Sequence, residues 1–350
     1  MKAKTLFAIA LAAGFAQAQM TPEVAKQISE IGRGVCKDQT EQIYRPIHPN
    51  PPYAGITISR DQSFGSDPKN VADVFVADKG GKNRPILIFV PGGPGNRIEG
   101  GTNGDIFYDN VLLWAARNGM VGVNMQRRAG TAWDDPAKDI SLVIQWAQKN
   151  AARYKGNPAR IFVWAHSLGN VSTSTYIAHP EYWTPTGVGV KGVIFMSAAA
   201  FDILPAKAPT VAGPAPTCNQ PSGLPAPAAA ADAGRGGAGR GDAKGGGRGD
   251  AKGGGKAAPA EQPDEATMLA RSNMPGLVKS KVPYMVSNAE FDPPNTAAFS
   301  ETLKDELCKA GRCPVYLFNK GHNHFSEVMT ADTADASVTG PVLKWMKSVK

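Results

Sequence analysis

One serine occupies a position typical of an enzymatic nucleophile. Residues 161–170 read IFVWAHSLGN, which is an apolar strand, a serine between small residues and the start of a helix. A serine on a tight strand-to-helix turn forms a nucleophile elbow, whose usual pattern is G-x-S-x-G; here Ala165 takes the first glycine position. The alternative is that Ser167 only caps the helix. We predict that Ser167 attacks carbonyl carbons.

A nucleophilic serine needs a base, and the base needs an acid that orients it. An acid pair, Glu290 and Asp292, follows an apolar run, and a histidine pair, His322 and His324, follows the next one. The chain order is then serine, acid, histidine, with both pairs after the carboxyl ends of predicted parallel strands. We predict Asp292 as the acid and His324 as the base. Glu290 and His322 are the alternatives.

Acyl transfer also requires donors for the oxyanion that develops on the substrate. One donor is expected to be the backbone N–H of Leu168, the residue after the nucleophile. A glycine-rich segment, VPGGPGN at 90–96, directly follows an apolar strand and can supply the second. Pro94 has no N–H, so Gly93 is our choice and Gly92 the alternative. The competing interpretation is a simple Gly-Pro turn.

The elements that must position these residues alternate along the chain. Short apolar runs indicate strands, and longer amphipathic segments indicate helices. Strands are predicted at 85–90, 120–124, 160–164, 192–196, 282–286 and 314–318, and helices at 139–147, 171–179, 296–309 and 340–349. Such alternation predicts an α/β fold with a mostly parallel sheet and helices on both of its faces.

Two segments fall outside this pattern. Residues 1–18 have a basic start, a short apolar run and a small-x-small end, which predicts a secretory signal peptide. Residues 205–262 consist mainly of Ala, Gly and Pro, with a near-tandem RGDAKGGG repeat, and they cannot bury enough apolar surface to offset their chain entropy. We therefore predict one domain in two parts, 19–204 and 263–350, separated by a disordered insertion.

The four cysteines are even in number, which in an exported chain suggests disulfides. Cys308 and Cys313 lie close together with a glycine between them, and we favour that bridge. Cys36 would then pair with Cys218, at the start of the insertion. Three pairings are formally possible, and the sequence does not choose among them. The spacing of Cys and His residues does not fit a metal site.

Together these segments resemble the esterase/lipase branch of the α/β-hydrolase superfamily. The stretch from Asp139 through PARI at 158–161 to the elbow is similar to feruloyl-esterase-like and hormone-sensitive-lipase-like carboxylesterases. The GGPG loop is instead similar to that of proline iminopeptidases, except that Pro91 replaces their histidine. The resemblance covers about 75–349 without the insertion, which falls where the family often carries a cap. It implies a serine carboxylesterase that needs no cofactor.

Composition and charge indicate which partners the protein has. The formal charge is +8, but Lys and Arg do not cluster with aromatic residues, so nucleic acid is not an expected partner. We expect a small-molecule or polymeric ester as substrate, no integral membrane segment after signal removal, and a periplasmic or secreted location. The rival functions are an amide- or peptide-bond hydrolase of the same fold, a non-catalytic exported binding protein, and a surface-interaction protein that uses the repeat.

Overall fold

The computed structural model describes residues 19–98, 106–128, 132–201, 215–225 and 264–350. The predicted signal peptide and most of the predicted insertion lie outside the described residues. Within these ranges, no helix has the length and apolar character needed to cross a membrane.

A single eight-stranded sheet organises the molecule, in the order β1-β2-β4-β3-β5-β6-β7-β8. The pairs β1–β2 and β2–β4 are antiparallel, and all remaining neighbours are parallel. The predicted α/β class is thereby confirmed, with an added antiparallel edge. The strands are β1 (Ile56–Ser63), β2 (Val71–Ala77), β3 (Arg84–Val90), β4 (Val121–Met125), β5 (Gly156–His166), β6 (Gly192–Met196), β7 (Tyr284–Phe291) and β8 (Val315–Asn323).

Side chains alternate between two cores along each central strand, as the period of two in a strand requires. On β3, Ile86, Ile88 and Val90 face one core, whereas Leu87 and Phe89 face the other. The strands β5 and β6 divide their side chains in the same way. A strand buried on both faces reads as a continuous apolar run, which is why the central strands were predictable.

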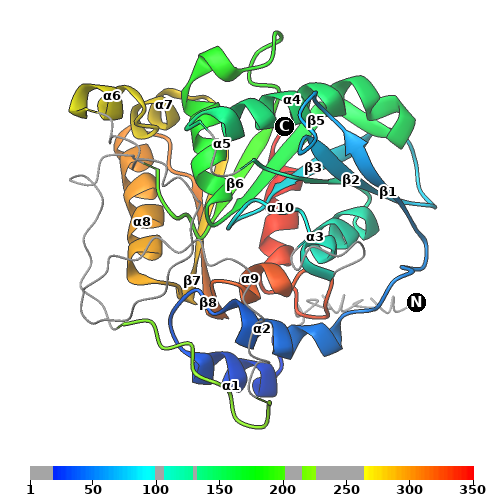
Figure 1. Ribbon diagram of the computed structural model, residues 1–350, viewed down its shortest axis with the longest axis vertical. Helices are drawn as coiled ribbons and strands as arrows, with labels where there is room; N and C mark the ends of the chain where they lie inside the picture. The colour runs from blue at the N-terminus through cyan, green and yellow to red at the C-terminus, as the bar shows by residue number, and fades with distance from the viewer. Residues whose placement is uncertain (1–18, 99–105, 129–131, 202–214, 226–263) are drawn as a thin grey trace, which may run out of the picture.

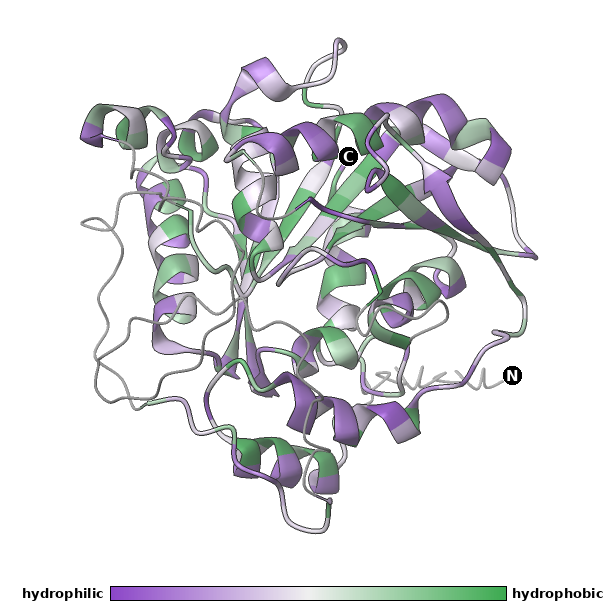
Figure 2. Cartoon of the chain, viewed as in Figure 1, coloured by the Kyte–Doolittle hydropathy of each residue, from purple (hydrophilic) through white to green (hydrophobic). Residues whose placement is uncertain are grey.

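Helices cover both faces of the sheet (Figure 1). The first core includes residues of α4 (Asp135–Asn150), α5 (Gly169–Ala178), α7 (Met274–Lys279) and α8 (Pro294–Lys309). The second core includes residues of α3 (Ile106–Arg117), α9 (Ser326–Met329) and α10 (Thr339–Ser348). Figure 2 shows hydrophobic residues concentrated on the strands and on the helix faces turned toward them.

Several elements were not predicted from the sequence. They are β1, β2, α3, α1 (Pro22–Ile31), α2 (Lys37–Tyr44), α6 (Glu265–Ala270), α7, α9 and the short 3-10 helices at Arg45–Ile47, Ala151–Tyr154 and Pro180–Tyr182. A third apolar cluster joins α1 and α2 to the starts of α3 and α9. The structure also links Cys36 to Cys218 and Cys308 to Cys313 by disulfides.

Candidate active site

Ser167 lies on a sharp turn between β5 and α5. Its φ of 53° is in the left-handed region, which is uncommon for a residue with a side chain. The Ser167 N–H donates to the Met196 carbonyl on the neighbouring strand, at 3.1 Å. A Cβ on Gly169 would approach the Val90 carbonyl oxygen to 2.3 Å, so only glycine lets the helix begin this close to β3. These contacts are those of a strained strand–turn–helix elbow.

The glycine-rich loop packs directly against this serine. A Cβ on Gly92 would lie 2.7 Å from the Ser167 Cβ and 3.1 Å from the His166 carbonyl oxygen. Gly93 follows with a φ of 49°. Within the described ranges, the N–H groups of Gly93 and Leu168 have no backbone acceptor. Both groups are therefore available as donors to a ligand at Ser167.

Arg127, which was not predicted from the sequence, hydrogen-bonds the backbone of this loop. Its side chain donates to the carbonyl oxygens of Gly93 at 2.6 Å and Pro91 at 3.3 Å. The residue is 5% exposed, and burial lowers the pKa of its guanidinium to about 10. Nothing in the local sequence separates Arg127 from its neighbour Arg128, because only the tertiary fold decides which arginine turns inward.

The predicted acid and base lie together. His324 Nδ1 is 2.7 Å from Asp292 Oδ1. The other carboxylate oxygen, Oδ2, accepts from Ser197 Oγ at 2.6 Å and from the Ala289 N–H at 2.7 Å. Asp292 is completely buried, so these donors and the imidazole are what compensate its desolvation.

The opposite edge of the imidazole is buried and carries no hydrogen bond within the described residues. His324 Nε2 has no partner among them, so the second hydrogen bond of a triad, between Ser167 and His324, is not formed in the structure. Such bonds are often long in free enzymes and tighten when substrate binds.

The alternative candidates point elsewhere. Glu290 Oε2 accepts from the Gly321 N–H at 2.7 Å. His322 lies within β8 and bonds Ser326 Oγ through Nδ1 and Ser337 Oγ through Nε2. Burial lowers the pKa of His322 to about 4. Both side chains thus have structural partners of their own, away from the Asp292–His324 pair.

Two further buried groups, His166 and Glu327, lie near the pair. The His166 ring lies against His324, tilted by 40° with 4.8 Å between ring centres, and its Nε2 lies 2.8 Å from the His324 carbonyl oxygen. Glu327 accepts from Asn319 Nδ2 at 2.7 Å. Burial and the charge of Asp292 raise the pKa of Glu327, while burial and the neighbouring His324 lower that of His166. Glu327 had no sequence signal beyond its position three residues after His324.

The arrangement is suited to acyl transfer. It combines a hydroxyl on a strained turn, two N–H groups beside that hydroxyl, and an imidazole oriented by a buried carboxylate. No group of three or more His, Cys, Asp or Glu side chains in the described part of the chain is placed to hold a metal ion.

Comparison with known proteins gives short sequence matches and long structural ones. No protein-family model matches the chain. Human carboxylesterase 5A is 31% identical over 115 residues, which are 30% of this chain and 19% of that protein. The chain thus spans about a fifth of the length of the curated relatives it matches.

Among solved structures, esterase B from Lactobacillus rhamnosis has a TM-score of 0.61 at 11% identity, covering 88% of this chain and 90% of that one. The hyperthermophilic esterase from the archaeon Pyrobaculum calidifontis has a TM-score of 0.55 at 14% identity, covering 96% and 94%. At such identities the likeness concerns the fold. With the observed strand order and the elbow after β5, it establishes that this protein has the α/β-hydrolase fold.

Proposed function

We propose that the protein is an exported serine carboxylesterase, with Ser167 as nucleophile, His324 as base and Asp292 as the orienting acid. The observation that carries the proposal is the 2.7 Å contact between His324 Nδ1 and a completely buried Asp292 carboxylate, at the carboxyl edge of the parallel strands where the strained Ser167 turn also lies. The short match to human carboxylesterase 5A and the likeness to solved esterases agree with this reaction class.

The mechanism uses two acyl-transfer steps. Ser167 Oγ attacks the ester carbonyl while His324 Nε2 takes its proton, and Asp292 stabilises the imidazolium. The N–H groups of Leu168 and Gly93 donate to the oxyanion. His324 then gives the proton to the departing alcohol. Water attacks the acyl-enzyme by the same route, releases the acid and restores Ser167. The buried carboxylate keeps the Nδ1 proton in place, so Nε2 is free to accept.

Export is part of the proposal. Two disulfides within the described residues favour an oxidising compartment, and the predicted signal peptide at 1–18 supplies the route. The proposed location is the periplasm or the extracellular space. We expect the purified mature protein to contain both disulfides and to show no free thiols in a thiol titration.

The test is hydrolysis of p-nitrophenyl acetate and butyrate by the mature chain, beside Ser167→Ala. A matched control is Ser172→Ala, a buried serine on α5 one turn beyond the elbow. We expect activity in the wild type and the control, and none in Ser167→Ala. Labelling by a fluorophosphonate should add one phosphonyl group to the peptide that contains Ser167. Activity that survives Ser167→Ala would overturn the assignment, and faster cleavage of matched p-nitroanilides would favour the amide hydrolase instead.

A further inference from the structure

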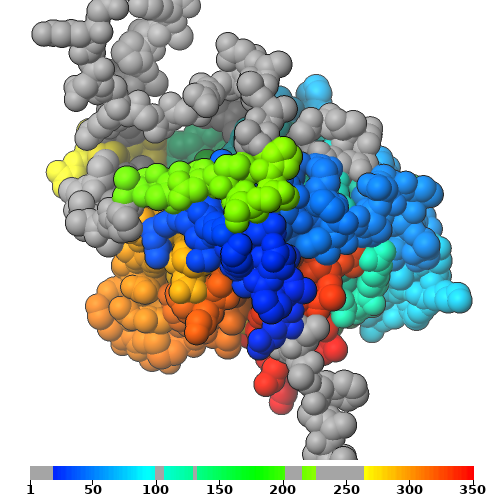
Figure 3. Space-filling model, turned by 90° about the horizontal axis from the view of Figure 1, so that it is seen from below, coloured from blue at the N-terminus to red at the C-terminus, as the bar shows by residue number. Residues whose placement is uncertain are grey.

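Two helices and a segment distant in sequence form a layer beside the candidate active site. The helices α1 and α2 lie below the carboxyl ends of β7 and β8 (Figure 1). Residues 215–225, here called the strap, run across them, and Figure 3 shows this strap in light green over the blue helices. The strap belongs to the stretch 205–262, and it is the part of that stretch that the structure describes.

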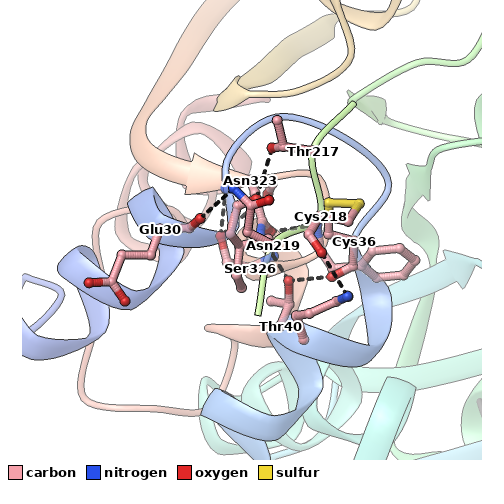
Figure 4. The surroundings of a disulfide bond; sticks show 11 residues. Glu30, Cys36, Thr40, Thr217, Cys218, Asn219, Asn323 and Ser326 are labelled. Atoms are coloured by element: carbon pink, nitrogen blue, oxygen red, sulfur yellow. Dashed lines mark hydrogen bonds between the residues drawn. A yellow bond between two sulfur atoms is a disulfide. The ribbon is translucent and has the colours of Figure 1, made fainter. Parts of the chain in front are cut away.

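The strap is held by a covalent bond and by several hydrogen bonds (Figure 4). A disulfide joins Cys218 to Cys36 at the start of α2. The N–H of Thr217 donates to the Arg33 carbonyl at 3.0 Å, and the side chain of Gln39 donates to the Cys218 carbonyl at 2.9 Å. The strap is therefore fixed to the connection between α1 and α2 and to the first turn of α2.

The same connection contacts the loop that carries the predicted acid. Arg33 Nη1 donates to the backbone carbonyl of Asp292 at 2.6 Å. The next residue, Gly34, donates its N–H to the carbonyl of Phe291 at 3.1 Å. Two consecutive carbonyls at the end of β7 are thus bound by two consecutive residues of the α1–α2 connection. The strap bonds that connection through the Arg33 carbonyl.

A second chain of hydrogen bonds reaches the loop of the predicted base. The Thr40 hydroxyl donates to the Cys36 carbonyl at 2.6 Å and accepts from Asn323 Nδ2 at 2.8 Å. Asn323 Oδ1 accepts from the N–H groups of Phe325 and Ser326, at 3.1 and 2.8 Å. Asn323 precedes His324, and its side chain bonds the N–H groups of the two residues that follow His324. The Thr40 hydroxyl fixes the orientation of the Asn323 amide.

These contacts are buried, so they are not easily replaced by water. Thr40 and Asn323 are completely buried, and Cys36 is 2% exposed. Cys36 packs in the third apolar cluster with residues that flank the site, namely Phe107, Phe325 and Met329. Loss of a buried partner leaves a polar group unsatisfied, and the surrounding loop shifts to recover a bond. A shift of about 1 Å in a reacting group can cost about 100-fold in rate.

We propose that Arg33 and Thr40 are positioning residues for Asp292 and His324, and that the Cys36–Cys218 disulfide clamps them in place. The inference rests on the proposed function, because it gives these residues a role only through the acid and the base. The layer of α1 and α2 then positions the acid and the base, and the strap holds this layer in place.

Two conservative pairs of variants test the positioning. Arg33→Gln removes the charge and shortens the side chain, while Arg33→Lys keeps a donor. Thr40→Val removes the hydroxyl at constant shape, while Thr40→Ser keeps it. We expect kcat to fall by about 10- to 100-fold in Arg33→Gln and Thr40→Val, with KM close to the wild-type value. Arg33→Lys and Thr40→Ser should recover most of the loss. Unchanged kcat in Arg33→Gln and Thr40→Val would overturn the proposal.

The chain provides its own control for the clamp. The second disulfide, Cys308–Cys313, joins the end of α8 to the residues before β8. The double variant Cys36→Ala with Cys218→Ala should lose about 10-fold in kcat, and Cys308→Ala with Cys313→Ala should retain the wild-type value. Equal losses in the two double variants would overturn the role of the clamp. Rates are expressed per site titrated by a fluorophosphonate, so that unfolded protein does not count.

A spectroscopic measurement separates this inference from the proposed function. The downfield ¹H resonance of the His324 Nδ1 proton, bonded to Asp292, should broaden or shift in Arg33→Gln and Thr40→Val and be retained in Arg33→Lys and Thr40→Ser. If the wild type shows no Ser167-dependent hydrolysis, the proposed function fails, but this resonance still reports on positioning. If hydrolysis depends on Ser167 and the resonance is the same in all four variants, the positioning inference alone fails.

Discussion

Replacing Arg127 with methionine is expected to reduce catalysis without destabilising the fold. Burial lowers the pKa of this guanidinium to about 10, well below its usual range, which corresponds to roughly 3 kcal/mol by which the charged form weakens the folded state. Because the folded pKa is below the unfolded one, this cost is present in full at neutral pH. It disappears only as the pH rises from about 10 through the pKa of the unfolded chain.

Methionine removes that cost together with the hydrogen bonds to the loop. A bond from a charged donor contributes about 1.5–3 kcal/mol, and the shortest one here goes to the Gly93 carbonyl at 2.6 Å. Gly93 is exposed, so water can replace the donor. The two effects offset, and the free energy of unfolding should change by less than about 1.5 kcal/mol. In contrast, kcat should fall by about 100-fold because the Gly93 N–H is no longer held toward the oxyanion.

The neighbouring residue offers a control with the opposite result. Arg128 pairs with the completely buried carboxylate of Asp139, at 2.6 Å. Arg128→Met leaves that charge without its main partner and should cost about 3 kcal/mol, while kcat per titrated site stays unchanged. Urea unfolding and initial rates with p-nitrophenyl butyrate give both quantities. A loss of stability in Arg127→Met with full kcat would refute the reasoning.

Four further outcomes are expected. Gly92→Ala should abolish esterase activity, because its Cβ would lie 2.7 Å from the Ser167 Cβ; a normal rate with p-nitrophenyl acetate would contradict this packing. Asp292→Asn should lower kcat by about 10⁴-fold with the fold retained, as stopped-flow rates and circular dichroism can show. The lowered pKa of His322, about 4, means that stability is lost as the pH falls from 6.5 through 4, by about 3 kcal/mol, and His322→Asn should flatten this dependence in urea titrations. Glu327→Gln should keep kcat near the wild-type value, since burial raises the pKa of Glu327 and so favours its neutral form; a large loss would indicate an ionised carboxylate.

The central fold was predictable because each inner strand is apolar on both faces. The run at 192–196 has the same bounds in the sequence analysis and in the structure. The edge strand β1 was missed for the opposite reason: it alternates exposed and half-buried residues such as Arg60 and Gln62, and its pairing depends on a tertiary neighbour. Its neighbour β2 is mostly buried, but it was missed as well. The helices α1 and α2 are short and bury only Ile28 and Ile31, and Thr40, Ile43 and Tyr44, respectively, so each presents few apolar positions in the sequence.

The candidate site was only partly predictable. The motif around Ser167 is local, and so is the glycine loop, so both could be located from spacing. Which of two nearby histidines meets the acid is set by where β8 ends, after Asn323, and by a left-handed Gly321 with a φ of 78°. Arg127 gave no local signal, because its contact with the loop is made across strands β3 and β4.

The buried groups around His324 explain how one carboxylate can orient the proposed base although another lies close by. Glu327 and His166 are both completely buried, with 3.9 Å between Glu327 Oε1 and His166 Nε2. An ion pair there would place two additional charges in a buried site, and burial instead favours the neutral form of each. The Ser197 hydroxyl donates to Asp292, and the Asn319 amide donates to Glu327. Because burial disfavours a charge on Glu327, the carboxylate that faces the His324 imidazole is that of Asp292.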